Sequence, residues 1–197
     1  MKTKTYTILA ISILMTMAIG CSGSSSPTNC PEMGNITSVD NSGPCLTQDT
    51  RIGSKAPNFT WSTIDCQSLE PIAGKTMSLN GLQSKPVMII FHKTMNCPGC
   101  KAQMPFIRAA YDQRTNKNLI VLTIYRGDST ADVKRFVLSQ GYIFPALADP
   151  DDAFAANCGF PIGAPITIFV DANGTIKAEK VGPFQSQEEI TSMFDKL

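Results

Sequence analysis

The sequence predicts an α/β domain in which a central mixed sheet is flanked by helices. Its 197 residues are 43% hydrophobic, which is enough to bury the core of one ordinary globular domain. After residue 86, short apolar runs alternate with segments of helical periodicity, as in sheets that are covered by helices. Near the C-terminus, Asn173-Gly174 is typical of a tight hairpin turn and predicts an antiparallel pair of strands.

The first predicted elements are two strands that form an N-terminal β-hairpin extension. Residues 59–64 and 76–79 have strand character, and turn-forming residues lie between them. The folded domain is expected to begin near Arg51 and to comprise residues 51–197.

The centre of the sheet is predicted from two apolar runs. Residues 87–92 and 119–125 are short and are bounded by turn-forming residues, as expected of buried strands. Residues 100–114, which lie between them, carry apolar side chains at helical spacing. This order predicts a strand, a helix and a second strand.

The C-terminal part continues the alternation. Residues 131–140 present one apolar face and are followed by Gly141, a common helix stop, so they predict a helix. The remaining predicted elements are a short helix, two strands around the Asn-Gly turn and a terminal helix, at residues 151–157, 165–171, 175–180 and 187–197.

The charge pattern excludes a nucleic-acid-binding surface. The formal net charge is +1, and neither a basic run nor an alternation of aromatic and charged residues occurs. The acidic residues between Asp149 and Asp152 are expected to form a turn and a helix start rather than a metal site. We expect no metal ion and no organic cofactor.

The N-terminus has the pattern of a secretory signal. Lys2 and Lys4 precede a mostly apolar stretch at residues 8–19, which is too short for a comfortable transmembrane span. Residues 18–21, Ala-Ile-Gly-Cys, resemble the lipoprotein box of bacteria, with Ala where Leu is usual. The resemblance implies that residues 1–20 are removed and that Cys21 is lipidated.

Residues 21–50 are predicted to form a flexible tether. They are rich in Ser, Gly, Asn, Pro and Thr, a composition that buries little apolar surface. Such a tether would hold the folded domain away from a membrane surface on the extracytoplasmic side.

The most informative motif is Cys97-Pro98-Gly99-Cys100. It follows the apolar run at 87–92 and precedes a predicted helix, so Cys97 is expected at a helix N-terminus. Unpaired backbone N–H groups and the helix dipole favour a thiolate there, and the thiolate is the form that attacks disulfides. Cys100, one turn later, can close a disulfide with Cys97. The motif predicts exchange between a dithiol and a disulfide.

Four motifs resemble those of the TlpA/ResA group of membrane-anchored thiol-disulfide oxidoreductases, which overlaps the redoxin (AhpC-TSA) superfamily and has the thioredoxin fold. They are Gly53-Ser-Lys-Ala-Pro-Asn-Phe59, Met77-Ser-Leu-Asn-Gly-Leu82, Cys97-Pro-Gly-Cys-Lys-Ala-Gln-Met-Pro105 and Gly163-Ala-Pro-Ile-Thr-Ile-Phe-Val-Asp171. The resemblance implies that Cys97 attacks, that Cys100 resolves, and that Pro165 is a cis-proline which binds the substrate strand together with Ala164. It also implies a reductant of disulfide-bearing exported proteins, such as apocytochrome c, that is supplied by a membrane electron donor.

Several positions around the motif depart from this group. Asn96 replaces a common Trp, and His92 with Lys93 replaces a Phe-Trp pair. Gln103 stands where many members have Glu, and Phe91 stands where thioredoxin has a buried Asp. The carboxylates that usually accept the proton of the second thiol are therefore absent.

The thiolate environment is predicted to include further neighbours of the motif. Pro98 and Gly99 lie within it, and His92, Lys93 and Gln103 flank it. His92 could tune Cys97 electrostatically, and a lysine could stabilise the thiolate. The simpler interpretation is a packed histidine and solvated lysines.

The other cysteines are interpreted as structural. Zinc would need two further ligands beside Cys97 and Cys100, and no second close pair exists. A disulfide-permissive compartment instead favours cross-links among Cys30, Cys45, Cys66 and Cys158. Cys30–Cys45 would close a small loop and Cys66–Cys158 would tie the early hairpin to the core, but four cysteines allow three pairings and the sequence does not decide among them. An alternative is that Cys158 serves as an extra redox thiol.

Two rival functions remain open. Thr94-x-x-Cys97 resembles the T-x-x-C of peroxiredoxins, but Ile90 stands where their proline would be. A thiol peroxidase would place an arginine near the thiolate, and Arg126 is the nearest strand-end candidate. The second rival is a non-catalytic envelope protein that uses the same fold to bind a partner.

Overall fold

The computed structural model describes residues 30–40, 51–157 and 165–197. The predicted signal peptide, Cys21, Cys45, Cys158 and Ala164 lie outside these residues. Among the helices of the described part, none is both long enough and apolar enough to cross a bilayer.

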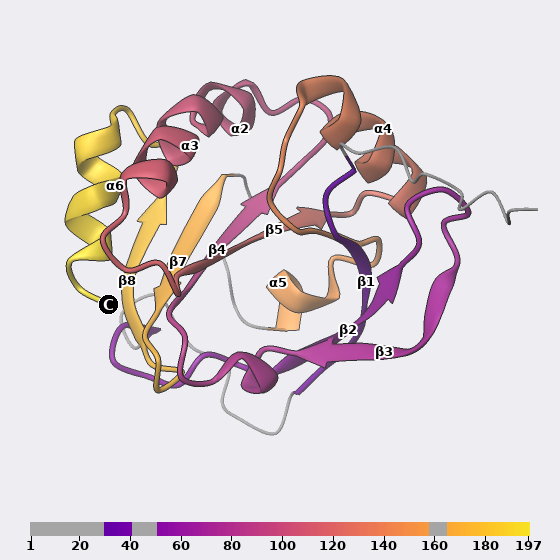
Figure 1. Cartoon of the computed structure of the whole chain (residues 1–197), viewed down its shortest axis with the longest axis horizontal. Coiled ribbons are helices and arrows are strands. Elements are labelled where there is room, and N and C mark those ends of the chain that lie inside the picture. The colour runs from indigo at the N-terminus through magenta and orange to yellow at the C-terminus, as the bar shows by residue number, and fades with distance from the viewer. Residues whose placement is uncertain (1–29, 41–50, 158–164) are drawn as a thin grey trace, which may run out of the picture.

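The described residues form one 8-stranded mixed sheet in the order β3-β2-β1-β6-β5-β4-β7-β8 (Figure 1). β4, β5 and β6 run parallel, whereas β7 is antiparallel to β4 and to β8. The strands are β1 (Met33–Val39), β2 (Phe59–Ile64), β3 (Pro71–Ser78), β4 (Val87–His92), β5 (Ile120–Arg126), β6 (Ala146–Asp149), β7 (Ile166–Val170) and β8 (Ile176–Val181).

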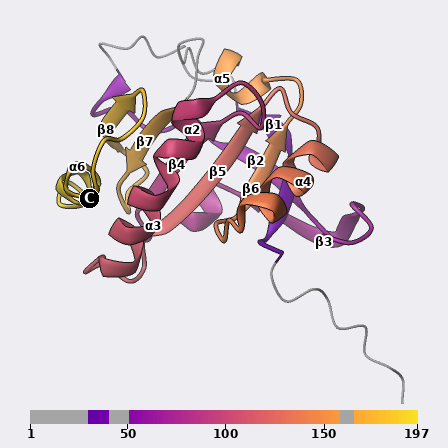
Figure 2. The ribbon, with the colours of Figure 1, turned by 90° about the horizontal axis from the view of Figure 1, so that it is seen from above.

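Most helices cover one face of the sheet, and α5 lies on the opposite side, inside the curve of the strands (Figures 1 and 2). Alternation along β4 explains both layers, because successive side chains of a strand point to opposite faces. Met88 and Ile90 pack with Ile107 on the face of the long helices. Ile89 and Phe91 pack on the other face. The helices are η1 (Asn80–Leu82), α2 (Pro98–Ala102), α3 (Met104–Gln113), α4 (Thr130–Gln140), α5 (Ala153–Asn157) and α6 (Gln187–Phe194).

The predicted β-hairpin extension is confirmed as β2 and β3, which pair antiparallel. The helix that was predicted over 100–114 is instead two helices, α2 and α3, which meet at Gln103. Pro105 lies in the first turn of α3 and lacks the N–H that would bind the carbonyl of Lys101, so the helix is interrupted here. Gly141 ends α4 as expected, with a φ of 64° in the left-handed region.

The prediction of a tether over residues 21–50 is wrong for its described part. Residues 33–39 form β1, which pairs antiparallel with β2 and parallel with β6. Met33 is buried, and a side chain at Gly34 would lie 2.7 Å from Trp61 Cδ1. The folded domain therefore begins before Arg51, with β1 inside the sheet.

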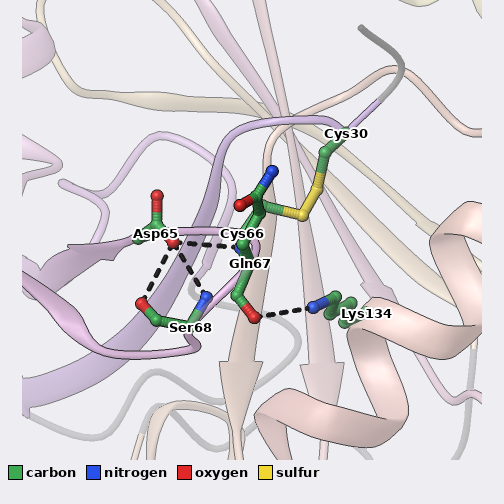
Figure 3. The surroundings of a disulfide bond; sticks show 6 residues. All are labelled: Cys30, Asp65, Cys66, Gln67, Ser68 and Lys134. Carbon is green, nitrogen blue, oxygen red and sulfur yellow. Dashed lines mark hydrogen bonds between the residues drawn. A yellow bond between two sulfur atoms is a disulfide. The ribbon is translucent and has the colours of Figure 1, made fainter. Parts of the chain in front are cut away.

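The structure identifies one of the disulfide pairings that the sequence left open. The structure joins Cys30 to Cys66, with a Cα–Cα distance of 6.5 Å (Figure 3). The turn after β2 is ordered beside it, because the Asp65 carboxylate accepts hydrogen bonds from Gln67 and Ser68. These bonds hold the pKa of Asp65 below its ordinary value. The cross-link ties the start of β1 to the hairpin, so residues 30–40 are held covalently as well as by strand pairing.

Candidate active site

The loop between β4 and α2 carries the first cysteine and is held by one aspartate. The backbone N–H and the hydroxyl of Thr94 donate to the two carboxylate oxygens of Asp128, each at 2.7 Å. Thr94 is buried, whereas the next two residues, Met95 and Asn96, are exposed. Asn96 has a φ of 53°, a left-handed conformation that asparagine tolerates. Asp128 thus fixes where the chain turns into the motif.

Replacing Asp128 by alanine is expected to loosen this loop and to slow disulfide exchange. Hydrogen bonds to a charged group contribute about 1.5–3 kcal/mol, so we expect a loss of stability of that order. Chemical denaturation and the rate of Cys97 modification would measure both effects. The matched control is Asp112→Ala, which removes only an exposed ion pair with Arg108 and should cost about 0.5 kcal/mol or less. Equal behaviour of the two variants would contradict this role of Asp128.

Cys97 and Cys100 form a disulfide with a Cα–Cα distance of 5.2 Å. Cys97 is the N-cap of α2, and its sulfur accepts a hydrogen bond from the backbone N–H of Cys100 at 3.2 Å. Pro98 fills the first helical position, where no N–H is needed. After reduction, the same N–H group would stabilise a thiolate on Cys97.

The two sulfur-bearing residues differ in access to solvent. Cys97 is 8% exposed, whereas Cys100 is completely buried. Only Cys97 can therefore be reached first by the disulfide of another protein. Cys100 is placed to attack afterwards, from inside. This asymmetry matches the predicted roles of the attacking and the resolving cysteine.

Pro165 lies beside the motif, as the sequence predicted. Gly99 is the contact point, since a Cβ atom there would lie 3.4 Å from Pro165 Cδ and 3.2 Å from Pro183 Cγ. Pro165 is buried, and its carbonyl accepts a hydrogen bond from Gly182 at 2.9 Å. An alanine Cβ at position 99 would touch Pro165 at an ordinary contact distance and would require the Pro183 ring to shift slightly.

Gln103 is buried below the motif and joins two segments. Its side-chain oxygen accepts a hydrogen bond at 3.3 Å from the backbone N–H of Phe184, which precedes α6. Its amide nitrogen has no hydrogen-bond partner among the described residues. In contrast, Lys93 is exposed, and the Lys101 ammonium lies over the Phe136 ring, 5.5 Å from its centroid. Gln103 therefore has a structural role here, whereas the two lysines face solvent.

His92 ends β4 and is completely buried. Its ring stacks on Tyr125, with 5.3 Å between centroids. Neither ring nitrogen has a hydrogen-bond partner within the described part of the chain. Burial lowers the pKa of His92 to about 3, because the charged form would lose its hydration. The imidazole is therefore neutral when the cysteines form a disulfide.

Arg126, the arginine considered for a peroxidase, is held by an acidic partner. Its guanidinium makes two hydrogen bonds to the Asp152 carboxylate, at 2.7 and 2.9 Å. Asp149 accepts from the backbone N–H groups of Ala153 and Phe154 at the start of α5. Burial raises the pKa of Asp149. The acidic residues therefore form the predicted turn and helix start, and the described residues contain no cluster that could hold a metal ion.

Comparison with known proteins assigns the chain that carries this site to a protein family. The model of the AhpC/TSA family matches residues 52–179. The chain belongs to the AhpC/TSA family. It is 25% identical over 148 residues to the thiol-disulfide oxidoreductase ResA of Bacillus thuringiensis (strain Al Hakam), which covers 75% of this chain and 79% of that protein. It is also 28% identical over 144 residues to the chloroplastic peroxiredoxin Q of Triticum aestivum, which covers 70% and 62% respectively.

The fold of the AhpC/TSA chain is confirmed as the thioredoxin fold by solved structures. A thiol:disulfide interchange protein from Chlorobium tepidum TLS, described as a thioredoxin family protein, has a TM-score of 0.57 at 24% identity. The alignment covers 73% of this chain and 94% of that one. Together with the Cys97–Cys100 disulfide, these homologues identify thiol-disulfide exchange as the chemistry of the site.

Sequence reasoning missed one residue that positions the site. Asp128 orients the Thr94 loop, and it lies outside all four of the family-like motifs. Its signal was weak, because an Asp that follows Gly127 at the end of a strand is usually part of a solvated turn. Gly99 of the motif lies against Pro165, on the side that the sequence predicted.

Proposed function

We propose that this protein is an exported, lipid-anchored reductase of disulfide bonds in other exported proteins. The observation that carries the proposal is the unequal exposure of the two cysteines, since Cys97 keeps 8% of its surface exposed and Cys100 keeps none. This arrangement lets one sulfur accept a partner while the other waits for the second step. The location rests on the N-terminal pattern, with Cys21 as the lipidated residue.

In the reaction, the reduced enzyme supplies both electrons. The Cys97 thiolate attacks one sulfur of the partner's disulfide, the partner's S–S bond breaks, and its first thiolate takes up a proton. Cys100 then loses its proton and attacks Cys97. The mixed disulfide breaks, the Cys97–Cys100 disulfide forms, and the partner leaves with both thiols. A membrane electron donor would return two electrons and two protons to the enzyme.

The substrate segment is proposed to bind in extended form beside Pro165 and Ala164. Pro165 is buried against the motif, and the neighbouring end of β8 exposes Val181. Pro183, which lies next to Gly99, and the exposed Met95, two residues before Cys97, add apolar surface near the motif. An unfolded, cysteine-bearing segment such as that of an apocytochrome c would suit an apolar surface of this kind.

The direction of transfer is testable in growing cells. Free thiols would be alkylated at once, and the state of Cys97 and Cys100 would be determined by mass spectrometry. We expect the pair to be mainly reduced, because the electron donor of a reductase keeps its cysteines in the dithiol form. A pair that is oxidised at steady state would overturn the reductant direction. The anchor is tested separately by labelling with a lipid precursor, which a Cys21→Ser variant should fail to incorporate.

The thiol peroxidase remains the weaker alternative. Its arginine candidate, Arg126, already holds Asp152 through two hydrogen bonds, which leaves it poorly placed to bind a peroxide. The binding-protein alternative predicts that replacing both Cys97 and Cys100 by serine leaves the cellular function intact.

A further inference from the structure

His92 holds a position in the sheet that leads directly to the redox pair. In the antiparallel pairing of β4 with β7, Phe91 lies opposite Ile166, so His92 comes opposite Pro165. In the parallel pairing of β4 with β5, His92 lies beside Tyr125. Pro165, which immediately precedes β7, His92 of β4 and Tyr125 of β5 therefore follow one another across the sheet.

The face of the sheet on which His92 lies is the one covered by the helix with the cysteines. His92 shares the strand alternation of Met88 and Ile90, whose side chains pack against α3. Tyr125, against which the imidazole stacks, packs edge-on against Phe136 of α4, and Lys101 of α2 lies over that same ring. The imidazole is thus enclosed between the sheet and the helices that follow the loop.

Above this row of residues, α2 brings in Cys100. Gly99 rests on Pro165, the neighbour of His92 across the sheet. Cys100 is the next residue and is completely buried, so its side chain points inward from α2 rather than to solvent. In the oxidised structure, its sulfur is bonded to Cys97 and has no proton to share.

A buried imidazole with two unpartnered nitrogens is costly, because each polar group has lost its hydrogen bonds to water. We propose that His92 accepts the proton of the Cys100 thiol when Cys100 resolves the mixed disulfide. This inference rests on the proposed function and deepens it. It also accounts for the absence of carboxylates at Phe91 and Gln103, the positions where related enzymes carry their proton acceptor.

The proton transfer conserves atoms and charge. The Cys100 S–H proton moves to a ring nitrogen of His92 while the Cys100 sulfur bonds to the Cys97 sulfur. The bond between Cys97 and the partner breaks, and the partner leaves as a thiolate. The imidazolium then returns its proton to that thiolate or to water, and His92 is neutral again. Burial keeps the pKa of His92 low, so its lone pair is free at the start. The same low pKa makes transfer from a thiol of pKa about 8.5 uphill, so the proton moves only in concert with formation of the S–S bond and is held briefly.

The other described titratable groups around the ring are either already protonated or bound to partners. Tyr125 stacks on it, and burial raises the pKa of this phenol, so the hydroxyl stays protonated. Asp128 is bound to Thr94, and the Lys101 ammonium lies over the Phe136 ring. Further charged groups on α4 and β8 have partners, namely Asp132 with Arg135, Lys134 with the Gln67 carbonyl, and Lys180 with Glu189. Among the residues that the structure describes here, His92 is the group left to take the proton.

The test separates the two steps of exchange. Reduced full-length protein is mixed with an equimolar amount of Ellman's reagent, a chromogenic aromatic disulfide, in a stopped-flow instrument. Attack by Cys97 releases the first coloured thiolate, and resolution by Cys100 releases the second. In His92→Phe we expect the first phase to be unchanged and the second to slow by about 10²-fold, the usual scale for losing a positioned base.

Two further variants keep the result interpretable. His92→Asn retains hydrogen bonding but takes up no proton, so it should be as slow as His92→Phe. Thr167→Val is the matched control, since it removes a different polar group, a completely buried hydroxyl on the same face of the sheet, and should leave both phases intact. In both His92 variants, the rate of the second phase should also keep rising as the pH is raised, until the Cys100 thiol ionises without a base. An ordinary thiol does so at about pH 8.5.

Three outcomes would overturn the role of His92. These are an unchanged second phase in His92→Phe, full rescue by His92→Asn, and a second phase that Thr167→Val slows as much as His92→Phe does. If the unmodified protein released no coloured thiolate at all, the proposed function would fail before the question of His92 arose. The replacement of a buried polar ring by an apolar one of similar shape should leave the fold intact.

Discussion

Replacing Cys97 by serine is expected to abolish the reduction of protein disulfides. Cys97 is the one residue of the redox pair with any exposed surface, and the N–H of Cys100 would stabilise its thiolate. Serine has no comparable nucleophilicity at neutral pH, so the rate should fall at least about 10³-fold, as is common on removing a catalytic nucleophile. Turnover of a disulfide-bonded protein substrate with dithiothreitol as reductant would measure the loss.

The companion variant, Cys100→Ser, should behave differently. It keeps the first step and loses the second, so a covalent mixed disulfide with the substrate should accumulate and be visible on a non-reducing gel. Denaturation of both variants should match that of the reduced unmodified protein, which shows that folding is not the cause. Activity that survives in Cys97→Ser, or a mixed disulfide at another cysteine, would contradict the assigned roles.

Removing residues 1–50 is expected to prevent folding of the rest. In the strand order, β1 links the β2–β3 hairpin to β6 and so to the central strands. The deletion removes Met33, whose burial is worth about 2–5 kcal/mol in comparable core positions. It also removes the Cys30–Cys66 cross-link, worth about 2–4 kcal/mol. The sum is comparable with the whole stability of a typical domain, about 5–15 kcal/mol.

The experiment compares residues 51–197 with residues 30–197. The longer fragment should unfold in one cooperative thermal transition, and the shorter one should show none or should aggregate through its unpaired strand edges. Cys30→Ser in the longer fragment separates the contribution of the disulfide from that of the strand. A cooperative transition in residues 51–197 would show that β1 is dispensable.

The strands and helices with strong periodicity were predictable from the sequence, and the exceptions have physical causes. In β1 the apolar residues Met33, Ile36 and Val39 are spaced by three, which is not the alternation of a regular strand. A register shift between Ile36 and Ser38 accounts for this spacing, because the bulge returns Val39 to the same core cluster as Ile36. Such a bulge leaves no signal in a polar segment.

Strand β6 was also missed, for a different reason. It has only four residues, Ala146–Asp149, and two of them are alanine, which has little preference for strands. Its position comes from parallel pairing with β1 and β5, a non-local interaction that the sequence does not reveal. The pairing of Cys30 with Cys66 has the same origin, since it depends on the place of β1 in the sheet.

The core of the site was predictable because its chemistry is local. The spacing of Cys97 and Cys100 and the helix that follows them place one sulfur at an N-cap and the other one turn inside. The contribution of Asp128 and the row formed by Pro165, His92 and Tyr125 required the strand registers. Those features arise from tertiary pairing rather than from any motif.

The reduction potential of the Cys97–Cys100 pair tests the central claim most directly. The protein would be equilibrated with glutathione or dithiothreitol buffers, and each cysteine pair would be followed by alkylation and mass spectrometry, so that Cys30–Cys66 is distinguished from the active pair. A reversible two-electron couple near that of thioredoxin, about −270 mV, is the predicted result for a reductase. A value near −120 mV, roughly that of a disulfide-forming oxidant, or the absence of any reversible couple, would contradict it.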